Sequence, residues 1–452
     1  MNETKKKITP ELAAGFRDYL PEDMIPRQKM LDTIRDTFEL FGFVPLDTPA
    51  IEKEEILTGG DEDFRMRIFR TNVQMGFDKL AMRFDLTVPL ARVIAQYPNE
   101  IKKPFKRYQV GKVWRAEKPQ AGRFREFIQF DADIVGSHNM IADAEIIALM
   151  YETLTALGLT HFLIRVNNRK ILNGLSDYAG FSHDQIVSVL RSIDKLDKQG
   201  WDAVREELQK PVTEEGSGLN DEQVRCIRTF LDIHGNNQQE MISMILSEMS
   251  NASSAQEGAY ELQKILYAVR ALGVPDDKWS IDLSVARGLG YYTGPVFETI
   301  LTDYKEIGSV FSGGRYDDLV DRFGSVSVPA TGASVGVDRL FAAMEKLGKI
   351  EKSKAISDVI ILNFDTECED YIQSVATMLR HDGINTEIYF GNDTMLKGQL
   401  SYVLNLEIPV VLIAGSSEKE KKTVQIKNVV TRKQNEVLFE NITSEVRTIL
   451  NV

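Results

Sequence analysis

The chain has 452 residues, which is too long for one ordinary domain and predicts two or three domains with separate cores. Hydrophobic residues make up 43% of the chain and charged residues 27%. No apolar run comes near the roughly 20 residues that span a bilayer, so we expect no membrane contact. The formal net charge of -13 argues against a general nucleic-acid coat and leaves room for a local basic surface.

The cysteines, the histidines and the N-terminus show no pattern for a disulfide, a zinc site or export. Cys226 and Cys368 are far apart in sequence, and the 5 histidines lack the close spacing of a zinc helix. The N-terminal MNETKKKITPEL carries lysines but no apolar segment of a signal peptide. We therefore expect reduced thiols, no zinc and a cytoplasmic location.

The first part of the chain predicts a helix followed by an antiparallel sheet. Residues 27–41 carry apolar side chains near helical spacing and lead into Gly42 and the strand-like FVPLD. Turn formers, rather than helix-length crossovers, separate the β-rich runs that follow, which are residues 79–86, 106–114 and 125–136. Short connections of this kind favour antiparallel pairing.

A helical insertion interrupts this pattern. Residues 182–272 contain apolar stripes with a period of 3.6 residues, separated by polar breaks. Strand signals return in WSIDLSV and VFETILTD, followed by a glycine cluster at Gly313 and Gly314 and a helix that begins near Gly336. The first sheet therefore resumes after the insertion.

The C-terminal part predicts a separate small α/β domain. After EKLGKIEKSK, strand-like and helical runs alternate, which is typical of βαβ units, and the boundary lies near Ser357. We expect an α+β fold with a catalytic domain on a mostly antiparallel sheet, a helical insertion and a C-terminal α/β domain. The predicted boundaries are 1–181 and 273–350 for the catalytic domain, 182–272 for the insertion and 357–452 for the last domain.

Nucleotide chemistry is indicated by arginines rather than by a phosphate-binding loop. Neither the P-loop pattern nor the dinucleotide fingerprint occurs in the sequence. Arg115, Arg123 and Arg125 instead lie on either side of a loop that contains proline and glycine, and guanidinium groups suit a polyphosphate because their planar donors bind it bidentately. The alternative is a charged hairpin whose arginines pair with Glu117 and Glu126 in solvent.

One face of the second strand of this hairpin mixes aromatic and polar side chains. Phe127, Gln129 and Asp133 are at even spacing, which places them on the same face of a strand. Phe127 has the flat surface needed to stack on a purine, and polar residues on an inward face indicate a small-molecule pocket.

These segments resemble the motifs of class II aminoacyl-tRNA synthetases. FGFVPLDTPAIE, with Pro49, resembles motif 1; GKVWRAEKPQAGRFREFIQFDADIVG resembles motif 2; and PATGASVGVDRLFAAM, with Arg339, resembles motif 3. ARGLGYYTGPVFE and SGGRYDDL resemble the two signature peptides of histidyl-tRNA synthetases. The resemblance extends from Gly15 into the last domain, which is similar to the anticodon-binding domain of class IIa enzymes.

The resemblance implies a set of histidine-binding residues: Asp85, Leu86, Thr87, Arg115, Gln129, Asp133, Arg287, Tyr291 and Tyr292. A carboxylate is what the amino acid's ammonium requires, and a phenol hydroxyl can bond an imidazole nitrogen while its ring packs against the imidazole. Without the flanking motif, the two tyrosines would indicate simple strand packing. At Gly290 the family commonly has an aspartate, so this chain lacks one carboxylate that could orient neighbouring groups.

The resemblance also implies an ATP site made of Arg115, Glu117, Arg123, Phe127 and Arg339, with Glu117 near Mg²⁺. Arg115 and Arg287 are implied to act in catalysis by flanking the α-phosphate, where charge develops during adenylation. An isolated arginine such as Arg339 would otherwise indicate a surface ion pair.

The expected function is therefore that of a histidine–tRNA ligase, which uses ATP to activate L-histidine and transfers it to tRNA(His). Motif 1 implies a homodimer, because it builds the subunit interface in this class. One alternative is the non-catalytic regulatory subunit of ATP phosphoribosyltransferase, which has the same fold but typically lacks the last domain. Another class IIa synthetase, such as the prolyl or threonyl enzyme, does not explain the two signature peptides, and a generic α/β dimerisation domain is the alternative for the C-terminal part.

Overall fold

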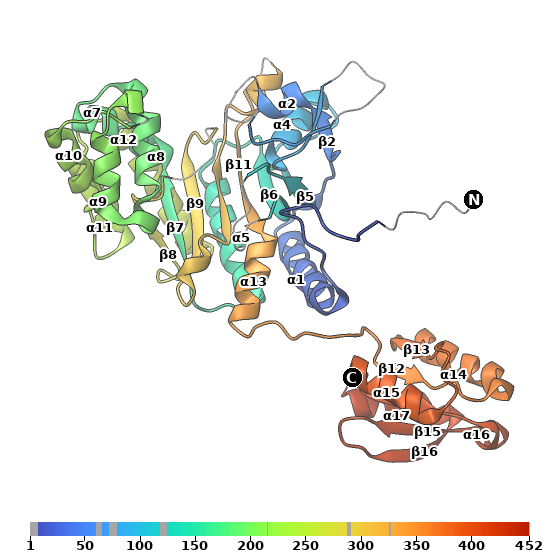
Figure 1. Ribbon diagram of the computed structural model, residues 1–452. Helices are drawn as coiled ribbons and strands as arrows, with labels where there is room; N and C mark the ends of the chain where they lie inside the picture. The colour runs from blue at the N-terminus through green and yellow to red at the C-terminus, as the bar shows by residue number, and fades with distance from the viewer. Residues whose placement is uncertain are drawn as a thin grey trace, which may run out of the picture. The chain divides into compact units, whose positions relative to one another are not determined.

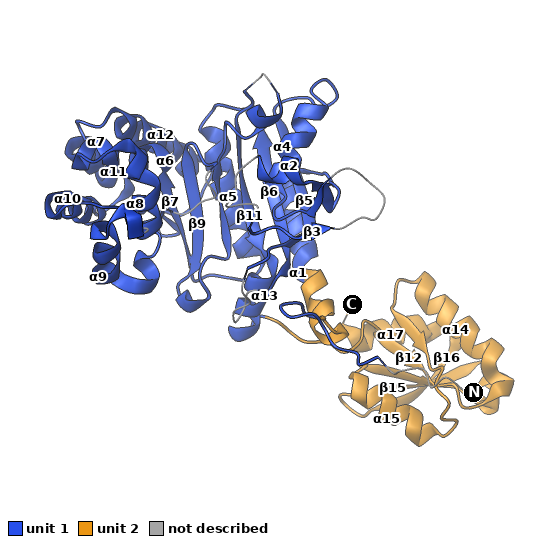
Figure 2. Ribbon diagram, turned by 45° about the horizontal axis from the view of Figure 1, so that its top comes forward, with its two compact units in different colours: residues 1–17, 30–349 blue, residues 18–29, 350–452 orange. Residues whose placement is uncertain are grey.

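The computed structural model describes residues 8–59, 66–71, 79–117, 124–214, 216–286, 291–324 and 327–451. The chain divides into two compact units, residues 1–17 with 30–349 (unit 1) and residues 18–29 with 350–452 (unit 2), which are blue and orange in Figure 2. Within the described ranges, no helix has the length and apolar character needed to cross a membrane.

Unit 1 is built on an eight-stranded sheet in which only the outer pairs, β1 with β5 and β7 with β8, are parallel among the described residues. The strand order is β1 (Val44–Pro45), β5 (Phe105–Trp114), β6 (Glu126–Val135), β11 (Ala330–Gly336), β10 (Phe311–Arg315), β9 (Pro295–Leu301), β7 (Phe162–Asn168) and β8 (Trp279–Ile281). A small second sheet has the order β2 (Ile51–Lys53), β4 (Leu80–Met82) and β3 (Arg70–Thr71). The predicted mostly antiparallel sheet is confirmed.

The two faces of β6 serve different purposes, as its alternating side chains predict. Phe130, Ala132 and Ile134 are buried on one face, where the ring of Phe130 lies 4.9 Å from that of Phe38 in α1 (Pro21–Leu40). The other face carries Gln129 and the polar residues that follow it at even spacing. The sheet therefore has a packed apolar side and a polar side.

Helices cover the sheet and extend beyond one end of it. Those from the catalytic segments are α1, α2 (Glu54–Thr58), α4 (Thr87–Gln96), α5 (Ile141–Ala156) and α13 (Val337–Lys346). The helical part comprises α6 (Arg169–Asn173), α7 (Leu175–Ala179), α8 (Ile186–Ile193), α9 (Leu196–Gln209), α10 (Asp221–Leu231), α11 (Gln238–Glu248) and α12 (Ser253–Ala271). In Figure 1 these green helices gather beside β7.

Two central strands, β10 and β11, are made largely of small residues that have little intrinsic tendency to form strands. Their glycines are required by close packing: a Cβ on Gly313 would lie 2.0 Å from the Gly332 carbonyl oxygen, and a Cβ on Gly332 would lie 2.1 Å from Oδ1 of Asp133. The glycine cluster seen in the sequence is thus part of the sheet.

Unit 2 is an α/β domain with a five-stranded sheet. The order is β13 (Thr386–Ile388), β12 (Val359–Ile361), β14 (Val410–Ile413), β15 (Thr423–Asn428) and β16 (Gln434–Leu438), with the first three parallel and the last two antiparallel to their neighbours. Its helices are α14 (Glu369–His381), α15 (Leu396–Leu406), α16 (Ser416–Lys421) and α17 (Ile442–Leu450). Apolar clusters cover both faces of the sheet, one containing Ile372 and Val446 and the other Val403.

Candidate active site

A cavity of about 680 Å³ lies on the polar side of the large sheet, and a smaller one of about 290 Å³ adjoins it. Most of the residues singled out in the sequence meet here. The larger cavity is lined by Asp85, Thr87, Arg115, Gln129, Asp133, Tyr291, Tyr292 and Arg339. The smaller cavity is lined by Arg115, Glu117, Phe127, Gln129 and Arg339. Of these predicted residues, the two cavities therefore share Arg115, Gln129 and Arg339.

Three of the predicted site residues are not among the described residues that line the cavities. Arg123 and Arg287 lie outside the described residues. Leu86 is fully buried and lines neither cavity; its backbone carbonyl accepts a hydrogen bond of 3.0 Å from Nη2 of Arg107. Leu86 thus contributes to the packing behind the site.

The larger cavity has an acidic wall. Oδ1 of Asp85 accepts the backbone N–H of Val88 at 3.0 Å, whereas its Oδ2 is buried without a hydrogen-bond partner among the described residues. Burial raises the pKa of Asp85 to about 6. An ammonium group would supply both the missing donor and the missing positive charge.

Asp133 is the best-supported carboxylate of this wall. Nη2 of Arg107 lies 2.8 Å from its Oδ2, and the hydroxyl of Tyr316 donates to its Oδ1. Burial raises the pKa of Asp133, and Arg107 opposes that rise. The guanidinium behind the wall therefore favours the ionised carboxylate that faces the cavity.

Two tyrosines form an aromatic side of the larger cavity. The rings of Tyr291 and Tyr292 are 5.1 Å apart and meet edge to face, and Tyr316 lies 6.0 Å from Tyr291 in a similar arrangement. Burial raises the pKa of both Tyr291 and Tyr292. Both phenols consequently keep their proton at neutral pH and can donate a hydrogen bond.

The junction of the two cavities is cationic. Nε of Arg115 donates to the carbonyl of Phe84 at 3.2 Å, and its guanidinium carbon lies 5.0 Å from the centre of the Phe127 ring. Arg339, near the start of α13, donates from Nη1 to the carbonyl of Ser309 at 2.6 Å. Backbone contacts thus hold both guanidinium groups at a place where two ligands would meet.

The sequence interpretation missed several residues of the larger cavity, including Asp131, Arg169, Glu298, Tyr316 and Ser334. Asp131 was detectable, because it lies at the same even spacing along β6 as Gln129 and Asp133. Glu298, Tyr316 and Ser334 lie inside the peptides that resemble the family motifs, so those motifs were the signal that could have found them. Arg169 lies outside these peptides.

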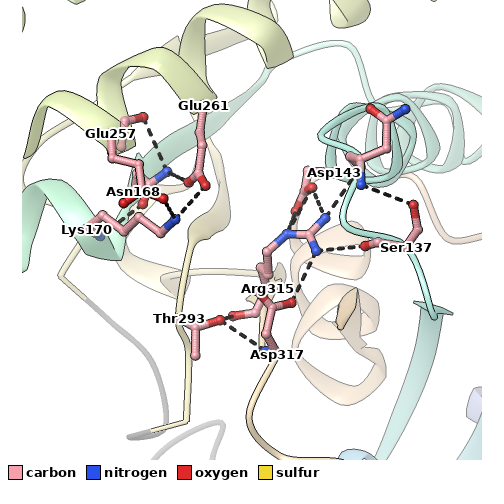
Figure 3. A network of polar contacts seen from close by, with 11 residues as sticks. Ser137, Asp143, Asn168, Lys170, Glu257, Glu261, Thr293, Arg315 and Asp317 are labelled. Carbon is pink, nitrogen blue, oxygen red and sulfur yellow. Dashed lines mark hydrogen bonds and ion pairs between the residues drawn. The ribbon is translucent and has the colours of Figure 1, made fainter. Parts of the chain in front are cut away.

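Buried ion pairs fix the elements around the cavity. Figure 3 shows Arg315, the last residue of β10, between the carboxylates of Asp143 in α5 and Asp317, with Nη1 donating to the Ser137 carbonyl at 2.9 Å. Because Tyr316 follows Arg315 directly, this network places the hydroxyl that contacts Asp133.

Polar contacts also tie the helical part to the sheet. In Figure 3, the side-chain nitrogens of Asn168 and Lys170, at the end of β7 and in α6, each lie 2.7 Å from Glu261 of α12. Arg165 of β7 binds Asp197 of α9 at 2.7 Å and Asp282 at 2.6 Å. These contacts hold α9 and α12 against the sheet edge beside the cavity.

Comparison with known proteins agrees with the motifs. A family model described as Histidyl-tRNA synthetase matches residues 15–340, and one described as Anticodon binding domain matches residues 358–449. The curated histidine–tRNA ligase of Clostridium tetani is 41% identical over 441 residues, covering 96% of this chain and 98% of the relative.

Solved structures give the same picture. Histidyl-tRNA synthetase from Nostoc sp. PCC 7120 superimposes with a TM-score of 0.86 and 32% identity, covering 98% of this chain and 100% of that one. A Bacillus halodurans protein described as an ATP phosphoribosyltransferase regulatory subunit/histidyl-tRNA synthetase has a TM-score of 0.72, covering 88% of this chain and 97% of that one. Its identity of 24% supports a shared fold and no more.

Proposed function

The chain belongs to the histidyl-tRNA synthetase family and is a histidine–tRNA ligase, and we propose that its two adjoining cavities hold histidine and ATP. The single observation that carries this proposal is the sharing of Arg115 and Arg339 by an acidic, tyrosine-lined cavity and a smaller cavity with Phe127. A cationic junction is where the carboxylate of one ligand and the phosphates of the other would meet.

In the larger cavity, the ammonium of histidine would be bound by Asp85, Thr87, Gln129 and Asp133. Asp85 and Gln129 each have a buried side-chain oxygen without a hydrogen-bond partner among the described residues, and an ammonium carries three donors. The hydroxyls of Tyr291 and Tyr292 would recognise the imidazole nitrogens. This pocket discriminates by polar groups that an incorrect amino acid would leave unpaired.

In the smaller cavity, adenine would stack on Phe127 and the phosphates would lie along Arg115 and Arg339. Arg123 and Arg287 keep the phosphate-binding and catalytic roles that the resemblance implies. The histidine carboxylate attacks the α-phosphorus, a new phosphorus–oxygen bond forms, and pyrophosphate leaves with the electron pair of the broken bond. Arg115, already held by the Phe84 carbonyl, stabilises the developing charge without reorganising.

Magnesium would enter with the nucleotide. Among the described residues there is no group of three or more His, Cys, Asp or Glu side chains that could hold a metal ion. Glu117 is nevertheless exposed in the wall of the smaller cavity, and Mg²⁺ commonly binds through one or two carboxylates plus substrate phosphates. When bound, the ion would neutralise phosphate charge, with Glu117 as its protein ligand.

Transfer to tRNA(His) completes the reaction: a ribose hydroxyl at the 3′ end attacks the histidyl carbonyl, and AMP leaves. Unit 2 would bind the anticodon, because residues 358–449 match the anticodon-binding model. Lys397, Lys422 and Lys433 are exposed and would supply local positive charge within an acidic protein. We place the reaction in the cytoplasm, because its substrates tRNA and ATP are found there.

The proposed homodimer is supported by exposed apolar side chains around motif 1. Leu40, Val44, Ile51 and Val110 come from α1, β1, β2 and β5, and they are 87%, 47%, 44% and 39% exposed. Exposed apolar side chains that lie together on one surface mark interaction sites, and the homodimer proposal requires these four to share such a surface. A second copy of the chain would bury them.

The test of the proposed function is pyrophosphate exchange into ATP, measured with the purified protein and each of the twenty amino acids. We expect exchange with histidine that depends on added magnesium, and background rates with the other amino acids. Histidine binding without exchange would instead support the regulatory-subunit alternative.

A further inference from the structure

The side-chain amide of Gln129 has two ends, and only one of them can bind an ammonium. Nε2 of Gln129 donates to the hydroxyl oxygen of Ser334 at 2.8 Å. Oε1 is buried and has no hydrogen-bond partner within the described part of the chain. Because an ammonium only donates hydrogen bonds, the substrate can use Oε1 but not Nε2. The direction in which the amide points is therefore critical.

Ser334 determines this direction through its single hydrogen. It lies opposite Asp131 in the pairing of β11 with β6, so the Asp131 carboxylate is the neighbouring acceptor for its hydroxyl, and Ser334 opposes the rise in the pKa of Asp131 that burial causes. A serine hydroxyl has one hydrogen and two lone pairs, so this hydroxyl has only lone pairs left for Gln129. Gln129 must consequently turn its nitrogen, rather than its oxygen, toward Ser334.

Asp131 fixes the direction of the Ser334 hydroxyl because it can only accept a hydrogen bond. Its side chain is 2% exposed, and an ionised carboxylate accepts hydrogen bonds but cannot donate them. Oδ1 of Asp131 also lies 3.5 Å from Nε2 of Gln129, which further favours the nitrogen on this side. If Asp131 did not accept the Ser334 hydrogen, that hydrogen could bind Oε1 and the amide would turn its NH₂ toward the ammonium.

We propose that Asp131 and Ser334 are positioning residues that hold Gln129 with its oxygen toward the ammonium of the amino acid substrate. The inference rests on the proposed function, which places the ammonium at Gln129. Neither Asp131 nor Ser334 has to touch the substrate for this role, because both act through the orientation of one amide.

The test compares two ligands by isothermal titration calorimetry of the full-length protein. One is L-histidine, and the other is 3-(imidazol-4-yl)propanoate, which has the imidazole and the carboxylate but no ammonium. Ser334→Ala should raise the Kd for histidine by about tenfold, the equivalent of one lost oriented hydrogen bond. The Kd for the propanoate should stay within about twofold, since a small change is typical of substitutions that break no contact.

Two further serine variants serve as controls. Ser334→Thr keeps a hydroxyl and should retain more histidine affinity than Ser334→Ala. Ser176→Ala removes a buried hydroxyl that donates to the Asn173 carbonyl at 3.1 Å in α7, away from both cavities, and should leave both Kd values unchanged. An equal loss of affinity for both ligands in Ser334→Ala would indicate general damage to the pocket and overturn the inference.

Gln129→Ala separates this inference from the proposed function. If Gln129→Ala weakens histidine and the added Ser334→Ala change then has no further effect, the coupling between the two residues is established. If Gln129→Ala weakens histidine but Ser334→Ala does not, the positioning role is refuted while the ammonium site remains. If Gln129→Ala leaves the Kd for histidine unchanged, the assignment of Gln129 to the ammonium is refuted as well.

Discussion

Removing the Asp143 carboxylate should destabilise unit 1 and loosen its active site. Asp143 is fully buried in α5, and Arg315 of β10, 2% exposed, binds it through Nε and Nη2. In Asp143→Ala, the guanidinium of Arg315 would keep the Ser137 carbonyl at 2.9 Å and Asp317 at 3.2 Å but lose its buried counter-charge. The remaining carboxylate partner, Asp317, has a partly exposed side chain, so the buried guanidinium charge would be only partly compensated.

The magnitude follows from this burial. Breaking a buried ion pair by removing one partner costs about 3–5 kcal/mol. For a unit of this size, that loss lowers the thermal midpoint by roughly 4–7 °C. Burial raises the pKa of the Asp143 carboxyl although Arg315 opposes the rise, so the pair is kept at a desolvation cost. The apolar pair Asp143→Leu with Arg315→Met should therefore recover most of the lost stability.

Thermal unfolding followed by circular dichroism gives the midpoint, and pyrophosphate exchange gives the KM for histidine. We expect the KM to rise in Asp143→Ala, because Tyr316, which donates to Asp133, follows Arg315 directly. A midpoint within about 2 °C of the parent would show that the pair contributes little and would refute the reasoning. A double variant less stable than Asp143→Ala would refute the account based on charge burial.

Three other outcomes are expected. Arg115→Ala should slow adenylate formation, measured by single-turnover quench-flow, by roughly a hundredfold to a thousandfold. Arg115→Lys should be only partly active, because an ammonium lacks the planar fork of a guanidinium. A rate for Arg115→Ala near that of the parent would contradict the role of Arg115 at the α-phosphate. Lowering the pH from 8 to 6 should weaken histidine binding by roughly tenfold, because Asp131 and Asp85 take up protons in this range; the pKa of Asp131 is raised to about 7. Calorimetry should show a smaller effect of pH on the Kd for histidine in Asp131→Asn. Because the folded protein holds these protons more tightly than the unfolded chain, the same pH change should stabilise the ligand-free fold through these two groups. If replacing both carboxylates by amides did not change how the thermal midpoint depends on pH, that result would be evidence against the raised pKa values. Leu40→Asp should dissociate the proposed homodimer in light scattering after size-exclusion chromatography, whereas an unchanged mass would place the interface elsewhere.

The sequence by itself determined the local character of the elements. The alternation along β6 predicted that Phe127, Gln129 and Asp133 share one face, because side chains of a strand point to opposite sides in turn. Helical periodicity likewise predicted the insertion and α13. The motifs then indicated the chemistry of Arg115 and Phe127, since they preserve residue types in a fixed local order.

Only the tertiary structure decided which distant residues complete the site. Gln129 and Ser334 are 205 positions apart, and the pairing of β6 with β11 is what brings them within 2.8 Å. Tyr316 reaches Asp133 across 183 positions in the same way. Strand register depends on the packing of whole elements rather than on local preference, so no periodicity marks these partners. The close packing that leaves no space for a Cβ on Gly313 or Gly332 likewise appears only in the assembled sheet.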